Sequence, residues 1–146
     1  IMAQLYVAFA KSAPPCTMTI LLILAHKLLS AVWKLGLALI LWAADDMKYT
    51  SGTGAPITTP RPPVVVTWSK YRGKGDVVFD KARPAVEKLA DAGGAAFSGK
   101  AATSVTFSEP GEYVLHVVAN DYSGDGGGGF ICCWTTAMMK VSVSPR

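Results

Sequence analysis

The chain has 146 residues, 51% of them hydrophobic and 16% charged, with a formal net charge of +4. The first 44 residues contain three lysines and no acidic residue, so the remaining 11 basic side chains nearly balance 10 acidic ones. This balance leaves no concentrated basic face, which excludes a nucleic-acid-binding protein. Beyond residue 44 the chain has room for one small domain.

The chain begins with a short apolar segment, residues 1–10, which is too brief to cross a bilayer. Pro14 and Pro15 separate it from the longer apolar run that follows. We expect residues 1–16 to lie on the cytoplasmic side of a membrane, at its surface or against neighbouring protein.

The longest apolar run covers residues 17–44. As a helix its 28 residues would reach roughly 42 Å, and the hydrocarbon core of a bilayer is about 30 Å thick. The sequence therefore predicts a single transmembrane helix. A cleavable signal peptide ending at Ala44 is the main alternative, but Trp42 stands where a small residue is usual.

Charges on the two sides of this run predict its orientation. Lys11 and Lys27 lie towards the amino terminus, whereas Asp45 and Asp46 follow the run. By the positive-inside rule, the amino terminus is cytoplasmic and the carboxy-terminal part is periplasmic. We therefore expect the protein in the inner membrane of a bacterium.

Polar residues in the run repeat at helical spacing, which would put them on one side of a helix. A bilayer disfavours a charge near its midplane, where Lys34 would lie. One reading is a plain anchor with two snorkelling lysines. The other is a docking stripe for a partner subunit, lipid phosphate or cofactor, formed by His26, Lys27, Ser30, Ala31, Trp33, Lys34 and Ala38.

His26, followed by Trp33 two turns later, resembles the pigment-binding helices of bacterial light-harvesting polypeptides. That resemblance implies magnesium ligation by a neutral imidazole, and hence contact with bacteriochlorophyll or haem through His26. Lipid contact through Lys34 is the other reading. Leu22 stands where those helices carry a small residue, which weakens the pigment hypothesis.

Residues 45–63 are rich in Thr, Ser, Gly and Pro, as in the run Pro60-Arg61-Pro62-Pro63. Such a segment buries too little apolar surface to form a core. We interpret it as a tether between the helix and an outer domain.

From residue 64 the hydrophobic period changes to two, which indicates strands. The predicted fold is mainly β: one transmembrane helix followed by a small immunoglobulin-like antiparallel sandwich over residues 64–146. Pro84 and Gly93 would bound one or two helical turns within residues 82–92. The predicted strands cover residues 64–68, 76–79, 104–108, 112–120 and 138–144.

A Trp-containing strand, VTWSKYRGKGDVVFD, is followed by TSVTFSEPGEYVLHVVAND. Together they resemble a bacterial immunoglobulin-like module of the polycystic-kidney-disease repeat type, over residues 64–143. The resemblance implies the fold but no chemistry. The module normally has two strands before the Trp strand, and only the Pro-rich tether is available for them here. Either the tether supplies an irregular edge strand, or the sandwich is truncated and a partner covers its open edge.

Tyr113 follows Pro110-Gly111 and would form a tyrosine corner, with its hydroxyl bonded to upstream backbone. Alternation from Tyr113 to Ala119 points these side chains into the core, where Trp68 faces them. His116 would then lie on the opposite face as a solvated or interfacial residue.

A glycine-rich loop, residues 121–130, precedes Cys132 and Cys133. We predict that Tyr122, Phe130 and Trp134 make external contacts. The adjacent cysteines would form a vicinal disulfide, remain two thiols, or bond to other chains. Metal binding is not expected, because the acids and cysteines of the loop have no ligand spacing.

No nucleophile has a base beside it, so we do not expect an enzyme. The first functional hypothesis is a structural accessory subunit of a large membrane complex, photosynthetic or respiratory, with integral membrane subunits and the lipid bilayer as partners. The alternative is a tethered binding module for a polysaccharide or a protein, which would use exposed aromatic side chains, including Tyr71.

Overall fold

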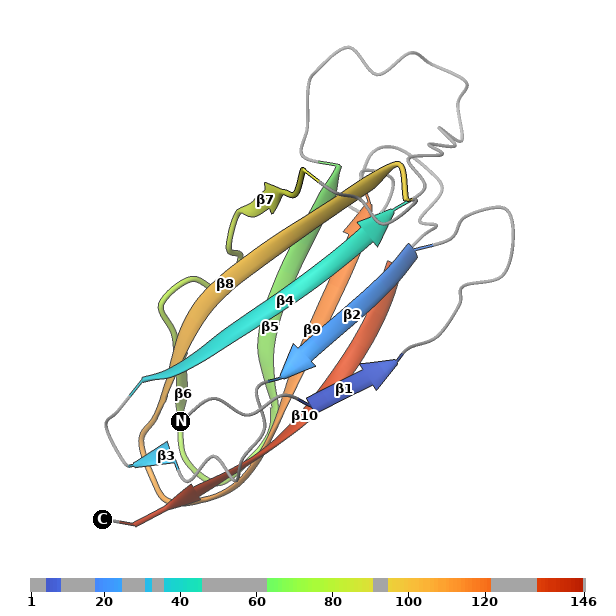
Figure 1. The fold of residues 1–146 in the computed structure, drawn as a ribbon. Coiled ribbons are helices and arrows are strands. Elements are labelled where there is room, and N and C mark those ends of the chain that lie inside the picture. Colours follow the sequence, from blue (N-terminus) through green and yellow to red (C-terminus); the bar gives the residue numbers. More distant parts are fainter. Residues whose placement is uncertain are drawn as a thin grey trace, which may run out of the picture.

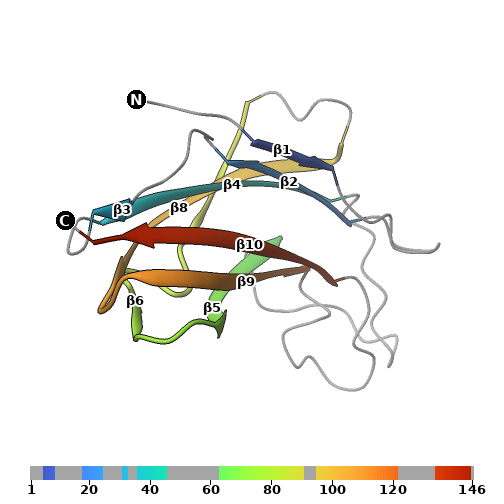
Figure 2. The ribbon, with the colours of Figure 1, turned by 90° about the horizontal axis from the view of Figure 1, so that it is seen from below.

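The computed structural model describes residues 5–8, 18–24, 31–32, 36–45, 63–90, 95–121 and 134–145. All the regular structure in these residues is β. Two sheets pack face to face, as the edge-on view in Figure 2 shows. The described residues therefore form a β-sandwich, which confirms that the chain is mainly β.

The first sheet has the strand order β1-β2-β4-β8-β6, with β7 also paired to β8 (Figure 1). Its pairs are antiparallel, and β4 runs against β8 over nine residue pairs from Leu37↔Val105 to Asp45↔Phe97. The strands are β1 (Leu5–Ala8), β2 (Met18–Leu24), β4 (Leu37–Asp45), β6 (Val77–Phe79), β7 (Val86–Lys88) and β8 (Phe97–Phe107).

The second sheet has the order β3-β10-β9-β5. The pairs β10–β9 and β9–β5 are antiparallel, whereas β3 pairs with β10 in parallel. The strands are β3 (Ala31–Val32), β5 (Val64–Arg72), β9 (Gly111–Asp121) and β10 (Trp134–Ser144).

Alternate residues of each long strand enter the core between the sheets, because successive side chains of a strand point to opposite faces. Tyr113, Leu115, Val117 and Ala119 of β9 are at most 1% exposed. Trp68 is 3% exposed and stacks on Phe79, with 6.4 Å between ring centroids. The predicted burial of Trp68 and of this face of β9 is confirmed.

The structure corrects the helix predicted for residues 17–44 wherever it describes that run, since residues 18–24, 31–32 and 37–45 are strands. Residues 37–45 form β4, in which Leu37, Leu39, Leu41 and Ala43 are buried and Ala38 is exposed. A strand that is apolar on both faces does not show the alternation of apolar and polar residues by which strands are predicted. The length of the apolar run was then the remaining signal, and it suggested a helix that spans a membrane. None of the described residues belongs to a helix with the length and hydropathy that a membrane crossing requires.

The same strand corrects the prediction of a truncated sandwich. β4 supplies the neighbour of β8, and β2 in turn pairs with β4 through Met18↔Asp45 to Leu21↔Trp42. The strands that precede the Trp strand thus come from the apolar run, and the sandwich begins well before residue 64. Because β4 pairs with β8, that edge of β8 is not open and gives no reason to expect a partner protein that covers it.

Residues 82–92 were predicted to contain helical turns, and this prediction is wrong for the described part. Residues 86–88 are β7, with Val86 opposite Ala101 of β8. The backbone nitrogen of Leu89 continues the pairing by donating to the carbonyl oxygen of Ser98 at 2.9 Å. Edge pairing therefore replaces the local helical hydrogen bonds that Pro84 suggested.

The five strands predicted between residues 64 and 144 are all present. Four are longer than expected: β5 continues to Arg72, β8 begins at Phe97, β10 begins at Trp134, and β9 gains one residue at each end. The extensions contain polar or glycine residues such as Ser69, Gly99 and Thr135, which interrupt the apolar pattern that defined the predicted strands.

Candidate recognition surface

The outward side of the second sheet gathers large apolar side chains. Of the four large hydrophobic side chains exposed among the described residues, three belong to this sheet: Tyr71 is 61% exposed, Trp134 51% and Met138 49%. The fourth, Val78 at 63%, lies on β6 of the first sheet. We call the outward side of β5, β9 and β10 the recognition face.

One row of this face crosses all three strands. His116 of β9 lies opposite Met138 of β10 on one side and opposite Ser69 of β5 on the other. Directly opposed residues share a face of the sheet. Tyr71 joins the row because its ring centroid is 6.5 Å from that of His116, with 57° between the rings.

A β-bulge in β5 accounts for the position of Tyr71. The register shifts between Lys70 and Arg72, so that these residues oppose Leu115 and Val114 respectively. A bulge inserts an extra residue and increases the local twist, which redirects the neighbouring side chains. Tyr71 and Arg72 are consecutive, yet both are exposed beside β9.

The neighbouring rows mix hydroxyl, apolar and charged groups. Val118 lies between Thr136 and Thr67, and Val114 lies between Lys140 and Arg72. Glu112 lies opposite Ser142, and the hydroxyl of Ser142 donates to Glu112 Oε1 at 2.5 Å. The recognition face is therefore neither a uniformly apolar patch nor a purely polar surface.

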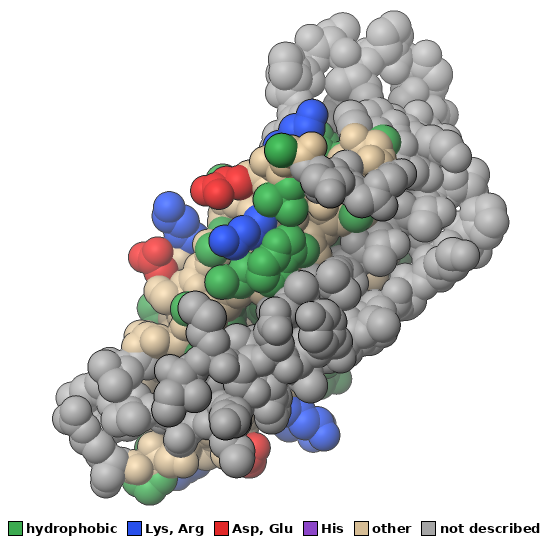
Figure 3. Space-filling view, viewed as in Figure 1, with side chains coloured by type: hydrophobic (Ala, Val, Ile, Leu, Met, Phe, Trp, Pro, Cys, Tyr) green, Lys and Arg blue, Asp and Glu red, His purple; other side chains and the backbone are tan. Residues whose placement is uncertain are grey.

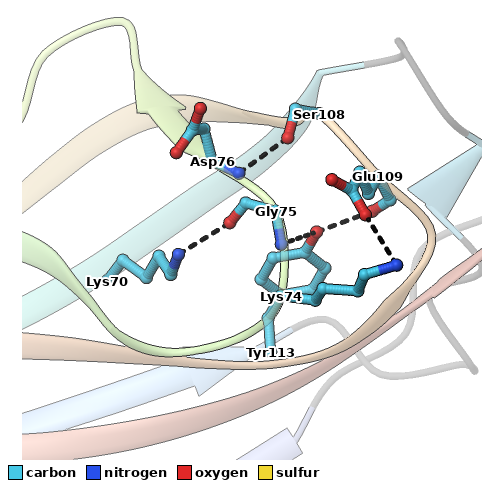
Figure 4. Close-up of polar contacts among 7 residues, drawn as sticks. All are labelled: Lys70, Lys74, Gly75, Asp76, Ser108, Glu109 and Tyr113. Atoms are coloured by element: carbon cyan, nitrogen blue, oxygen red, sulfur yellow. Dashed lines mark hydrogen bonds and ion pairs between the residues drawn. The ribbon is translucent and has the colours of Figure 1, made fainter.

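A network of hydrogen bonds holds the end of β5 that carries Tyr71 (Figure 4). The hydroxyl of Tyr113 donates to the carbonyl oxygen of Glu109 at 2.7 Å and accepts from the backbone nitrogen of Gly75 at 3.2 Å. Lys70 Nζ donates to the carbonyl oxygen of Gly75 at 2.7 Å. The predicted tyrosine corner is confirmed, and it also ties down the loop that follows β5.

The same loop is bonded to the turn after β8. The backbone nitrogen of Asp76 donates to Ser108 Oγ at 2.6 Å, and the nitrogen of Ser108 donates to the carbonyl oxygen of Asp76 at 3.0 Å. Lys74 and Glu109 form an exposed ion pair at 3.3 Å, which contributes little by itself. The bonds between Asp76 and Ser108 extend the pairing of β6 with β8 by one residue beyond Val77↔Phe107.

The outward side of the first sheet has a different character. Hydrophobic side chains there surround a basic group over β4 and β8 (Figure 3). Lys100 Nζ lies 6.0 Å from the ring centroid of Trp42, its direct neighbour across the strands. Trp42, Ile40 and Ala44 are only partly exposed, whereas Tyr71, Trp134 and Met138 of the recognition face are exposed.

The predicted contact residues have different outcomes. Trp134 is exposed, but it begins a strand instead of lying in a loop. Tyr71 is exposed at the end of β5. Ala31 is in β3 and Ala38 is exposed on β4, so neither contributes to a helical docking stripe. The other predicted residues lie outside the described residues: His26, Lys27, Ser30, Trp33, Lys34, Tyr122, Phe130, Cys132 and Cys133.

His116 is partly exposed on the side of β9 opposite the core, as predicted. Met138 was not predicted as a contact residue, although it occupies an outward position in a predicted strand. A large apolar side chain at an outward position of a strand is the feature of the sequence that would have identified Met138 as a contact residue. Among the described residues, no three His, Cys, Asp or Glu side chains gather in a group that would hold a metal ion.

No protein-family model matches the chain, and neither the curated proteins nor the solved structures compared with it give a match. The recognition face therefore has to be interpreted from its own residues.

Proposed function

We propose that the chain is a non-catalytic recognition module of the immunoglobulin-like type, and that its recognition face binds a polysaccharide. The observation that carries this proposal is the concentration of Tyr71, Trp134 and Met138, all about half exposed or more, on one side of one sheet. Isolated exposed apolar residues are ordinary on a protein surface, but a group of them on one face marks an interaction site.

A carbohydrate suits this face because aromatic and hydroxyl side chains lie side by side on it. The C–H face of a sugar ring packs on an aromatic ring, and its hydroxyl groups need hydrogen-bonding partners. Tyr71 offers an exposed ring, while Ser69 and Thr136 offer hydroxyl groups in the same and the adjacent row. The hydroxyl of Thr67, beside Thr136, is partly exposed and accepts from Arg83 Nε at 3.3 Å. The buried cores of protein interfaces are more uniformly apolar.

The site is also largely preformed. The inward side chains of β9 that alternate with the recognition face, Leu115 and Val117, have no exposed surface. Protein interiors are close-packed, so such strands change shape little on binding. The ligand then does not have to order the surface that it contacts, which reduces the cost of binding.

The non-catalytic assignment rests on the surroundings of the described histidine. His116 has Ser69, Tyr71 and Met138 as its neighbours across the sheet, and none of these is a carboxylate. The resemblance to the polycystic-kidney-disease type of module supports placing the chain outside the cytoplasm. We do not carry forward the membrane-complex subunit, because residues 37–45 of its docking helix are a strand.

Affinity electrophoresis through gels that contain soluble polysaccharides tests the proposal. Replacing both Tyr71 and Met138 with Ser removes exposed apolar contacts without touching the core. The Kd for the polysaccharide should therefore rise by at least about tenfold, or 1.4 kcal/mol, and the ligand should retard the variant less. Val78→Ser is the matched control, since Val78 is 63% exposed on the other sheet. Equal retardation of both variants would contradict the proposal.

The experiment also has to distinguish a protein ligand from a polysaccharide ligand. A protein ligand would give no retardation by any polysaccharide, together with a complex of defined mass that the Tyr71 and Met138 substitutions dissociate. That result would keep the recognition face and reject the polysaccharide.

A further inference from the structure

Two cations lie in one row of the recognition face. Lys140 of β10 and Arg72 of β5 both oppose Val114, the β9 residue between them. Both are exposed. Since neighbouring strands are about 4.8 Å apart, the backbones of these two residues are separated by roughly 10 Å across the sheet.

No described carboxylate lies in the row of this pair. Glu112, in the next row, keeps its negative charge, and its Oε1 accepts the hydrogen bond from the Ser142 hydroxyl instead of pairing with either cation. Neither Lys140 nor Arg72 forms an ion pair with a described residue. Lys70, by contrast, is bonded to the carbonyl oxygen of Gly75.

The cationic row runs directly beside the row of Met138, His116 and Ser69, because Val114 and His116 are successive outward residues of β9. A ligand that lies along the ring of Tyr71 therefore passes within reach of both positive charges. Electrostatic complementarity of this kind selects among ligands and increases the rate of association.

We infer that the recognition face selects an acidic polysaccharide, one whose sugar units carry carboxylates. The sugar rings pack on Tyr71, and carboxylates of the chain pair with Arg72 and Lys140. This inference rests on the proposed function and adds the class of ligand. Arg72 has the planar guanidinium that suits a carboxylate, and Lys140 supplies a point charge.

An acidic protein segment has the same charge but fits the face less well. Hydroxyl groups from Thr67, Ser69 and Thr136 interrupt the apolar side chains. Ser69 and Thr136 each offer a donor and acceptors to sugar hydroxyl groups, whereas Thr67 Oγ1 already accepts from Arg83 Nε at 3.3 Å. An acidic peptide segment of Asp and Glu residues has no ring to lay on the exposed ring of Tyr71.

The test compares binding of the full chain to polygalacturonate and to its methyl ester, which has the same backbone without the charge. We expect tighter binding to polygalacturonate than to the ester. The difference in affinity should be larger at low salt, because dissolved ions screen exposed charges. A single exposed ion pair contributes about 0.2 to 1 kcal/mol, so Lys140→Gln combined with Arg72→Gln should weaken this binding by roughly 2- to 30-fold. Binding to the ester should not change.

Lys81→Gln combined with Lys88→Gln is the matched control, because both lysines are exposed and lie outside the second sheet. This variant should bind like the unmodified chain. Far-ultraviolet circular dichroism and a thermal melt show that each variant is folded.

Equal affinity for polygalacturonate and its ester, unaffected by the Lys140 and Arg72 substitutions, would overturn the acidic ligand while the proposed function stands. Absence of binding to every polysaccharide would overturn both. Equally tight binding to polyglutamate, unaffected by Tyr71→Ser, would show attraction to charge alone and would also overturn the inference.

Discussion

The hydroxyl of Tyr113 and the carbonyl oxygen of Glu109, four residues earlier, are joined by a hydrogen bond of 2.7 Å. The same hydroxyl accepts from the backbone nitrogen of Gly75, which lies 38 residues away in the loop after β5. One buried side chain thus holds together the turn before β9 and the loop next to the recognition face.

Tyr113→Phe should lower the free energy of unfolding by about 1 to 3 kcal/mol, because it leaves the Gly75 nitrogen and the Glu109 carbonyl oxygen without this partner. Urea unfolding followed by circular dichroism measures the change. Tyr71→Phe is the control: its hydroxyl belongs to an exposed side chain, so a change within about 0.5 kcal/mol is expected. Equal losses would show that the hydroxyl of Tyr113 has no special role.

Gly73 is in contact with the same tyrosine. Its φ is +142°, and a Cβ built there would be 2.1 Å from Cδ1 of Tyr113. Gly73→Ala should therefore prevent folding or cost more than about 3 kcal/mol, since an unfavourable φ alone costs about 1 to 3.

Gly111→Ala separates the two causes. The φ of Gly111 is +147°, but a Cβ there would have no atom within 4 Å. This variant should lose only the backbone contribution, about 1 to 3 kcal/mol. Chemical denaturation of both variants decides the matter, and a larger loss for Gly111→Ala would contradict the packing around Tyr113.

Thr103 and Thr135 are both buried, but only Thr103 has its hydroxyl bonded. Its Oγ1 donates to the carbonyl oxygen of Lys81 at 2.8 Å and accepts from the nitrogen of Lys81 at 3.1 Å. Thr135 Oγ1 is buried and has no hydrogen-bond partner among the described residues. Valine has the same shape, so Thr103→Val should cost about 1 to 3 kcal/mol, whereas Thr135→Val should be neutral or slightly stabilising. Thermal melts of the two variants give the comparison, and the reverse order would refute it.

Much of the sandwich after residue 63 follows from its sequence. Alternation from Tyr113 to Ala119 and the Pro110-Gly111 turn determine which side chains enter the core and where the tyrosine corner forms. These features are local, so the sequence displays them directly. The exposed position of His116 follows from the same alternation.

The role of residues 37–45 could not be predicted in the same way. Ile40, Trp42 and Ala44 are as apolar as the buried Leu39, Leu41 and Ala43, so the segment shows no period. Its strand state depends on pairing with β8, some sixty residues later in the chain. Tyr71 was predicted as an exposed aromatic residue, but its position beside His116 depends on the bulge between Lys70 and Arg72.

The central structural claim is that residues 37–45 form a strand beside β8 and complete the sandwich that presents the recognition face. Ala38 and Ser104 are directly opposed in this pairing. Opposed residues of antiparallel strands have Cα atoms about 4.5 to 5.5 Å apart, which is within the range for a disulfide. Lys100 lies four residues before Ser104 in β8, roughly 13 Å away.

Mild oxidation of the double variant Ala38→Cys with Ser104→Cys, followed by mass spectrometry of the linked peptides, tests this claim most directly. We expect the link between positions 38 and 104 to form nearly completely, and the link in the control variant Ala38→Cys with Lys100→Cys to be minor. Failure of the first link, or equal yields of both, would contradict the strand.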